Sequence, residues 1–195
     1  EPIEQEAQMR LLEEIRNSDG KPSVLVLRPA DSAETTIAWE MALENKDTPT
    51  ALILTRQDVN DIPAIAGNRY SEAQGIRRGG YTVIDAPHPK VILVGNGSEV
   101  SLLCDVATEL EKEGISAEVI SVNTIKPLDE ATILASVKKT NKAITCENHN
   151  VIGGLYSAVA ELLCREYPIR LKGIGVNDQF GQVGKYDDLL KAYNM

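Results

Sequence analysis

The apolar residues between positions 91 and 122 are arranged as a strand, a tight turn, a helix and a second strand. Residues 91–94 form a short continuous apolar run, which is typical of a strand covered on both faces. A Gly-Asn-Gly turn follows, and Ser98 and Glu99 are predicted to be the N-cap and the first turn of a helix that stops at Gly114. A helix between two buried strands predicts a right-handed crossover between parallel strands.

The same alternation runs through the second half of the chain. Apolar runs predict strands at Tyr81–Ile84, Val91–Val94, Ala117–Val122, Ala143–Cys146 and Ile169–Gly173. Helical periodicity predicts helices at Ser98–Glu113, Asp129–Lys139, Ile152–Glu166 and Lys185–Tyr193. The first strand is followed by only a short turn, so we expect it to pair antiparallel at an edge. The pattern therefore predicts a complete α/β domain with a mostly parallel five-stranded sheet and one antiparallel edge strand.

The first part of the chain predicts only half of such a unit. A helix over residues 1–17 is expected to have an apolar face, made by Ile3, Ala7, Leu11 and Ile15. A buried strand at 23–27, a helix at 31–45 and a buried strand at 50–55 follow. This order is that of the second half of a doubly wound α/β unit, so we expect an incomplete unit that belongs to a longer protein.

Two local signals refine this reading. Asp31 and Glu34 have the spacing of a capping box at the start of the second helix. Residues 58–80 are punctuated by glycine and proline without periodicity, which predicts a linker between two domains. We therefore expect domain boundaries at 1–57, 58–80 and 81–195.

Composition and charge exclude several classes of partner. The chain has 195 residues and a formal net charge of −9, which disfavours nucleic acid and an anionic membrane surface as partners. Three scattered cysteines without a C-x-x-C pair favour reduced thiols and a cytoplasmic protein. The Gly95-Asn-Gly97 turn lacks the glycine that a dinucleotide fingerprint needs at Val100, so a dinucleotide site is disfavoured.

Few residues suggest chemistry. Cys146 and His149 are separated by two residues, which is the spacing of one ligand pair of a metal site. The sequence contains no second pair, so no metal site is predicted. Glu147 and His149 follow a strand end and precede Gly153-Gly154, where they could line a binding edge or an interface, although hydrogen-bonded loop residues are the favoured reading.

Two arginines follow predicted strands. Arg56 has the position and the donor fork for a phosphate or carboxylate, and an equally weighted alternative is a surface ion pair. Arg28 is followed by Pro29 and Asp31, which favours a structural salt link to an acid.

Several segments together resemble the carboxyl-terminal portion of transketolase, in the right order and over nearly the whole chain. In the first part, the similar segments are Arg28-Pro-Ala-Asp31, Pro49-Thr-Ala-Leu-Ile-Leu-Thr-Arg56-Gln57 and Gly79-Gly80-Tyr81. In the second part, they are Gly97-Ser-Glu-Val100, Glu147-Asn-His-Asn-Val-Ile-Gly-Gly154 and Asp178-Gln-Phe-Gly181. The resemblance implies the end of a pyrimidine-binding domain (1–57), a linker (58–80) and the transketolase carboxyl-terminal domain (81–195).

The resemblance also implies a division of roles. Members of the family move a two-carbon ketol unit between ketose and aldose phosphates, with thiamine diphosphate and a divalent ion such as Mg²⁺. Arg56 matches the arginine of the Ser-Arg-Gln segment that contacts the sugar phosphate, with Thr55 in place of serine. The segments that hold thiamine and metal would precede Glu1, so no catalytic, cofactor or metal residue is expected in this chain.

The expected partners follow from this division. They are an amino-terminal half and a second copy, as a homodimer or a heterotetramer of halves. The alternative is a non-catalytic interaction or regulatory module with the same fold, which fold alone does not distinguish.

Overall fold

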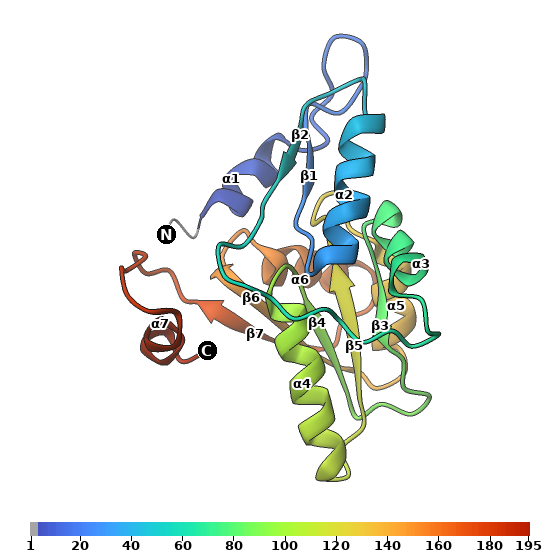
Figure 1. Ribbon diagram of the computed structural model, residues 1–195, viewed down its shortest axis with the longest axis vertical. Coiled ribbons are helices and arrows are strands. Elements are labelled where there is room, and N and C mark those ends of the chain that lie inside the picture. The colour runs from blue at the N-terminus through green and yellow to red at the C-terminus, as the bar shows by residue number, and fades with distance from the viewer. Residues whose placement is uncertain (1–3) are drawn as a thin grey trace.

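The structure is a computed structural model that describes residues 4–195 (Figure 1). Its strands are β1 (Leu25–Leu27), β2 (Thr50–Leu52), β3 (Gly80–Ile84), β4 (Val91–Gly95), β5 (Ala117–Val122), β6 (Lys142–Asn150) and β7 (Arg170–Val176). Its helices are α1 (Gln5–Leu12), α2 (Ser32–Glu44), α3 (Arg69–Ala73), the 3-10 helix η1 (Gln74–Arg78), α4 (Glu99–Lys112), α5 (Glu130–Val137), α6 (Leu155–Glu166) and α7 (Tyr186–Tyr193). None of these described helices is long and apolar enough to cross a membrane.

The main sheet has five strands in the order β3-β5-β4-β6-β7. Strand β3 pairs antiparallel with β5 at one edge, and the other pairs are parallel. The predicted α/β class with one antiparallel edge strand is therefore confirmed. The crossover through α4 makes β4 and β5 neighbours, with Leu93 opposite Val119.

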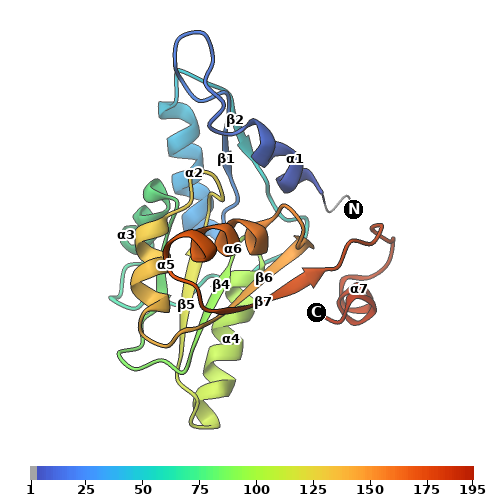
Figure 2. The same ribbon diagram turned by 180° about the vertical axis from the view of Figure 1, so that it is seen from behind.

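Helices cover both faces of this sheet (Figures 1 and 2). On one face, Val100, Leu103 and Cys104 of α4 belong to the same core cluster as Leu93 and Val119. On the other face, α5 and α6 pack over a second core cluster, which includes Ile92, Val94, Ile120, Leu155 and Leu162. The strands thus alternate their apolar side chains between two cores, as parallel strands buried on both faces do.

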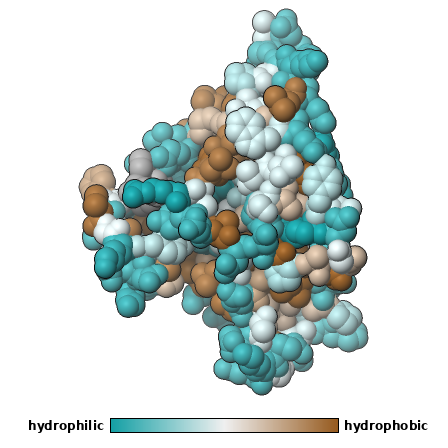
Figure 3. Space-filling model, in the orientation of Figure 1, coloured by the Kyte–Doolittle hydropathy of each residue, from teal (hydrophilic) through white to brown (hydrophobic). Residues whose placement is uncertain are grey.

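The incomplete unit is a two-stranded parallel sheet, β1-β2, with α2 beside it. The strands are shorter than predicted, and β2 is only half-buried, so the expected burial of residues 50–55 is wrong. The physical reason is that β2 is a short edge strand, with β1 as its only strand partner among the described residues. Figure 3 shows hydrophobic atoms at the surface in this upper region.

One core joins the two units. Leu27, Ile37 and Ala38 of the incomplete unit belong to the cluster that also holds Leu93 and Val119. Between the units, residues 58–80, the predicted linker, contain the short helices α3 and η1. Each of these helices has five residues, which is too short for a periodic apolar face to be visible in the sequence.

Helix α1 differs most from its prediction. It spans eight residues, and its buried side is marked by Glu6, whereas Leu11 is 72% exposed. Ile3, a predicted member of the apolar face, lies outside the described residues. The helix packs through a polar side chain because the surface it meets carries Arg28 and Asn96.

The predicted caps also differ in outcome. Asp31 accepts a hydrogen bond from the backbone N–H of Glu34 at 2.8 Å, as predicted for an N-cap. The Glu34 carboxylate reaches one residue further back than in a standard capping box, to the N–H of Ala30. Ser98 makes no side-chain cap. Its hydroxyl instead accepts a hydrogen bond from the Asn148 side chain at 2.9 Å.

Candidate substrate-binding cleft

A cleft of about 600 Å³ lies where the carboxyl ends of the two sheets meet. We call it the Arg56 cleft. Its walls come from the loop after β2, the first turn of α1, the turn after β4, the end of β6 and the arm that carries α7. The polar residues that matter for its chemistry are Arg28, Arg56, Gln57, Ser98, Asn148 and His149. Ligands of open α/β sheets gather at strand carboxyl ends, which makes this cleft the candidate site.

Arg56 lies on an exposed loop that lines this cleft. Because β2 ends at Leu52, Arg56 is four residues beyond the strand rather than at its end. The backbone N–H of Gln57 donates to the hydroxyl of Thr55 at 3.2 Å, which bends the chain around Arg56. An arginine on the wall of a cleft can bind a phosphate or a carboxylate through two parallel N–H donors.

Arg28 lines the same cleft but is buried and paired. Its Nη1 is 2.6 Å from a carboxylate oxygen of Glu6, so the predicted salt link to an acid is confirmed. Its Nη2 also donates to the side-chain oxygen of Asn148. Gly97 makes room for this side chain, since a Cβ there would lie 2.9 Å from Arg28 Nε. The charge of Arg28 is therefore already neutralised by Glu6.

Glu147 lies inside β6 and holds the start of α6. Its carboxylate accepts hydrogen bonds from the backbone N–H groups of Leu155, at 2.7 Å, and Tyr156, at 2.8 Å. A Cβ on Gly154 would clash with Oε2 of Glu147 and lie 2.8 Å from the backbone oxygen of Asn150, so glycine is required here. Burial raises the pKa of the Glu147 carboxyl to about 8, and the two N–H donors oppose that shift.

His149 also lies inside β6 and is buried. Its Nε2 accepts the backbone N–H of Glu6 at 3.0 Å, and its Nδ1 is 3.0 Å from the carbonyl oxygen of Asn150. A carbonyl oxygen only accepts, so Nδ1 carries the proton and the imidazole is neutral. Burial lowers the pKa of His149.

The ligand atoms of Glu6, Glu147 and His149 lie within 4.8 Å of one another. Such a group could hold a metal ion in principle. Here the carboxylate oxygens of both glutamates accept N–H donors, and both histidine nitrogens are engaged. The ligand atoms of these three residues are therefore already engaged, and the group does not offer a divalent ion open ligands.

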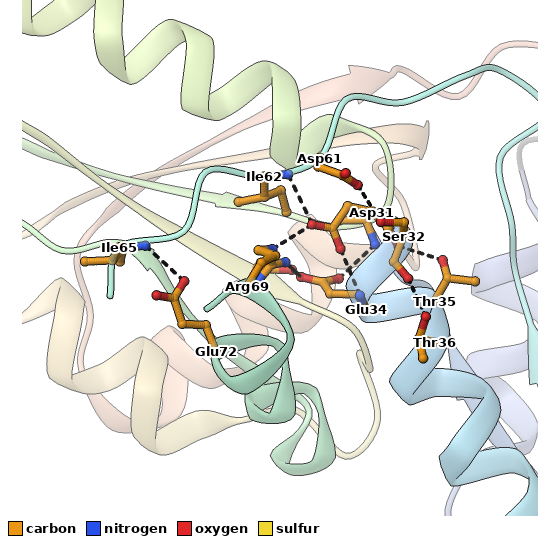
Figure 4. Close-up of polar contacts among 12 residues, drawn as sticks. Asp31, Ser32, Glu34, Thr35, Thr36, Asp61, Ile62, Ile65, Arg69 and Glu72 are labelled. Carbon is orange, nitrogen blue, oxygen red and sulfur yellow. Dashed lines mark hydrogen bonds and ion pairs between the residues drawn. The ribbon is translucent and has the colours of Figure 1, made fainter. Parts of the chain in front are cut away.

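A second polar cluster lies outside the cleft, beneath α2 (Figure 4). We call it the Glu34 network. Arg69 of α3 is 2.6 Å from an Asp31 oxygen and 3.1 Å from a Glu34 oxygen. The backbone N–H of Ile62 also donates to Asp31, at 3.1 Å. These contacts hold the segment 58–80 against the first turn of α2.

Sequence reasoning missed the cleft residues Glu6 and Asn148, the role of Ser98 as an acceptor, and Asn96, which donates to Glu6. Helical periodicity assigns a glutamate to the solvent-exposed face, so nothing in the sequence indicated that Glu6 is buried. For Asn96 and Asn148 a signal existed. Each lies two residues after the end of a predicted strand, where polar side chains are brought to a common edge of the sheet.

Comparison with known proteins decides the family. A family model described as the transketolase C-terminal domain matches residues 80–195, which is more than half of the chain. This chain belongs to the transketolase family. Among curated relatives of that family, the 6-deoxy-6-sulfo-D-fructose transketolase subunit of Clostridium sp. (strain MSTE9) is 35% identical over 175 residues, covering 89% of this chain and 51% of the relative. The transketolase of Staphylococcus aureus (strain MW2) is 42% identical over 123 residues, covering 63% of this chain and 17% of the relative.

Solved transketolase structures have the same fold. A split-gene transketolase, solved as an inactive beta4 tetramer, superposes with a TM-score of 0.79 and 31% identity over 99% of this chain and 57% of that chain. Transketolase from Leishmania mexicana superposes with a TM-score of 0.69 and 26% identity over 100% of this chain and 25% of that chain. The chain thus spans about half of the subunit relative and a smaller share of the full-length enzymes.

Proposed function

We propose that this chain is the carboxyl-terminal part of a transketolase that moves a two-carbon ketol unit between ketose and aldose phosphates. The complete cytoplasmic enzyme would use thiamine diphosphate and a divalent ion such as Mg²⁺. In this proposal residues 1–57 complete the pyrimidine-binding domain, residues 58–80 connect the domains, and residues 81–195 form the carboxyl-terminal domain. Family membership supports this assignment.

The observation that carries a substrate role is the position of Arg56 on the wall of the cleft. Arg28 shares that wall, but its ion pair with Glu6 commits its charge to the protein. We assign the sugar phosphate to Arg56 because it lies on the cleft wall and its guanidinium has the geometry for a bidentate contact. The reacting carbon and the cofactor would be held by residues of the partner half.

The proposed partners are an amino-terminal half and a second copy of the assembly. The relative from Clostridium sp. is named as a subunit, and the split-gene structure is described as a tetramer, which supports a division of the enzyme between chains. In this chain, the open side of β2 and the exposed apolar residues of α1 are surfaces that such a half would cover. Leu11, Leu12 and Leu54 are each at least half exposed.

Reconstitution tests the proposal. The chain is mixed with a purified amino-terminal half of transketolase, thiamine diphosphate, Mg²⁺ and a ketose phosphate, and ketol transfer to an aldose phosphate is measured. We expect activity from the mixture and none from this chain alone. Calorimetry should also detect no micromolar binding of thiamine diphosphate to the isolated chain. A chain that binds its partner but leaves transfer unrestored would support the alternative, a non-catalytic interaction module.

A further inference from the structure

Glu6 joins three elements that are far apart in the sequence. Its Oε1 accepts from Asn96 Nδ2 at 2.6 Å, at the end of β4. Its Oε2 accepts from Arg28 Nη1 at 2.6 Å, just after β1. Its backbone N–H donates to Nε2 of His149 in β6 at 3.0 Å. We call this set the Glu6 junction, and all four residues are buried.

The polar contacts of the Glu6 junction, rather than an apolar face, hold α1 against the rest of the protein. Leu11 and Leu12 in its last turn are exposed, and the buried residue of the helix is Glu6 in its first turn. Lys126 Nζ donates to the carbonyl oxygen of Arg10 at 3.0 Å, which adds a polar contact near the other end. The placement of the first turn therefore depends on directional polar contacts, which have narrow geometric limits.

The first turn is also part of the Arg56 cleft. Gln5 and Glu6 line this cleft together with His149 and Arg56. A shift of α1 would therefore change the shape of the cleft without any change at Arg56 itself.

We infer that Glu6 and His149 are positioning residues. In this inference the neutral imidazole of His149 fixes the first turn of α1 as one wall of the Arg56 cleft, and protonation of His149 at Nε2 releases that turn. This deepens the proposed function, on which its consequence for substrate rests. The junction itself is a property of this chain alone.

Protonation of His149 would break its hydrogen bond with the backbone N–H of Glu6. An Nε2–H would face the N–H of Glu6, so two donors would meet and the hydrogen bond would be lost. The charged groups that face the imidazole are Glu4 and Glu6 at the start of α1, Arg28 after β1, and Glu147 of β6. The carboxylates favour the charged ring, whereas burial and Arg28 oppose it, and burial is the largest effect. Release is therefore expected only on the acidic side of the ordinary histidine pKa.

Nitrogen NMR of the histidine rings tests the hydrogen-bonding state. The chain contains two histidines, and His88 is exposed in a turn, so it is an internal control. At neutral pH we expect His149 to be neutral with its proton on Nδ1, and His88 to exchange between tautomers. A His149 ring that carries its proton on Nε2 at neutral pH overturns the inference.

Hydrogen exchange of the α1 amides tests the positioning role. In His149→Phe, protection of the Glu6 amide and the turn after it should fall roughly three- to tenfold, the worth of one backbone hydrogen bond, while β4 and α6 keep theirs. In His149→Gln, a side-chain oxygen near the Nε2 position can still accept from Glu6. This variant should keep α1 protected at acid pH, where the wild-type chain loses protection.

Two outcomes count against the inference. Protection of α1 that is unchanged in a folded His149→Phe chain overturns the inference. So does a wild-type loss at acid pH that persists in His149→Gln but disappears in the control His88→Gln. If His149→Phe does not fold, the comparison of the wild-type and His149→Gln chains across pH still decides it.

The consequence for substrate is measured in the reconstituted enzyme. We expect His149→Gln to flatten the rise in KM for a ketose phosphate between neutral and acid pH, with kcat changed less. The exchange and NMR measurements need neither the partner half nor a substrate. If the exchange and NMR results agree with the inference but the chain never supports ketol transfer, the proposed function is contradicted. The positioning role of His149 in this chain is then still supported.

Discussion

The hydroxyl of Tyr81 donates a hydrogen bond to Oε1 of Glu34 at 2.6 Å, and this contact joins the edge strand β3 to helix α2. Glu34 is fully buried and accepts four further donors. These donors are the N–H of Ala30, Arg69 Nη2, Ser121 Oγ and Asn123 Nδ2. One carboxylate thus holds the incomplete unit, the segment 58–80 and the five-stranded sheet together.

We predict that Glu34→Ala lowers the free energy of unfolding by about 3–5 kcal/mol. The substitution leaves the Arg69 charge and the Tyr81 hydroxyl buried with fewer partners, and breaking a buried charged network costs that much. Urea unfolding at neutral pH measures the loss. The matched control is Glu40→Ala on the same helix, whose contacts with Tyr70 and Arg77 lie at the surface and should be worth less than about 1 kcal/mol. Equal losses in the two variants would contradict the bridging role of Glu34.

The buried carboxyl of Glu13 should make the free energy of unfolding depend on pH. It is 1% exposed, and neither carboxylate oxygen has a hydrogen-bond partner of good geometry among the described residues. Burial, with the nearby charge of Glu6, raises its pKa to about 8 from the ordinary 4.5. The folded chain therefore holds this proton more tightly than the unfolded chain. Its contribution is complete below pH 4.5 and is lost as the pH rises through 8.

Glu13→Gln removes this titration. Relative to the wild-type chain, the variant should gain roughly 1–3 kcal/mol between pH 5 and pH 8, because an uncharged amide needs no proton. Denaturant unfolding at both pH values measures the gain. Glu14→Gln is the control, since Glu14 is only half-buried and pairs with Arg16 at the surface. A Glu13→Gln chain with the wild-type pH profile would refute the assignment. The wild-type slope also contains Glu147, so some slope remains in the variant.

Arg56→Ala tests the phosphate contact in the reconstituted enzyme. The loss of charge-assisted hydrogen bonds worth roughly 1.5–3 kcal/mol should raise the KM for phosphorylated sugars about tenfold to a hundredfold. The effect should fall mainly on KM, because a phosphate remote from the reacting carbon is bound alike in the ground and transition states. Arg56→Lys should recover part of the loss, since it keeps the charge without the fork.

An unphosphorylated ketose donor is the control for this contact, because it has no phosphate to bind. Its KM should stay within about twofold in Arg56→Ala, well below the loss expected for a charged hydrogen bond. If both kinds of donor lose affinity by the same factor, Arg56 has a structural role.

Limited proteolysis with trypsin tests how the segment after β2 is held. Arg56 lies on an exposed loop, whereas Arg69 is bound to Asp31 and Glu34, and Arg77 is bound to Glu40 and Glu44. Proteases cut backbone that opens easily, so the first cut is expected after Arg56. Mass spectrometry of early time points identifies it. Arg56→Gln should delay the first cut.

The two pieces of that cut should remain associated in gel filtration. Leu27 and Ile37 on one side share a core cluster with Leu93 and Val119 on the other. Pieces that separate without denaturant, or a first cut at Arg77, would show that the segment is held less firmly than the structure indicates.

The sequence by itself determined the α/β class, the alternation of elements and the antiparallel edge strand. These follow from local apolar runs and helical periods, which depend on neighbours a few residues apart. It also determined the cap at Asp31, because that contact spans three residues. The resemblance to transketolase rested on short segments whose order along the chain is itself sequence information.

Only the tertiary structure decided where charge is buried. Glu6 contacts Asn96 and His149 across 90 and 143 positions of the chain, and Glu34 contacts Asn123 across 89. A glutamate on a helix has the same local pattern whether it faces water or a buried arginine. Hydrogen-bond partners so far apart in sequence leave no periodic signal, so the walls of the cleft became visible only once the sheets had brought their strand ends together.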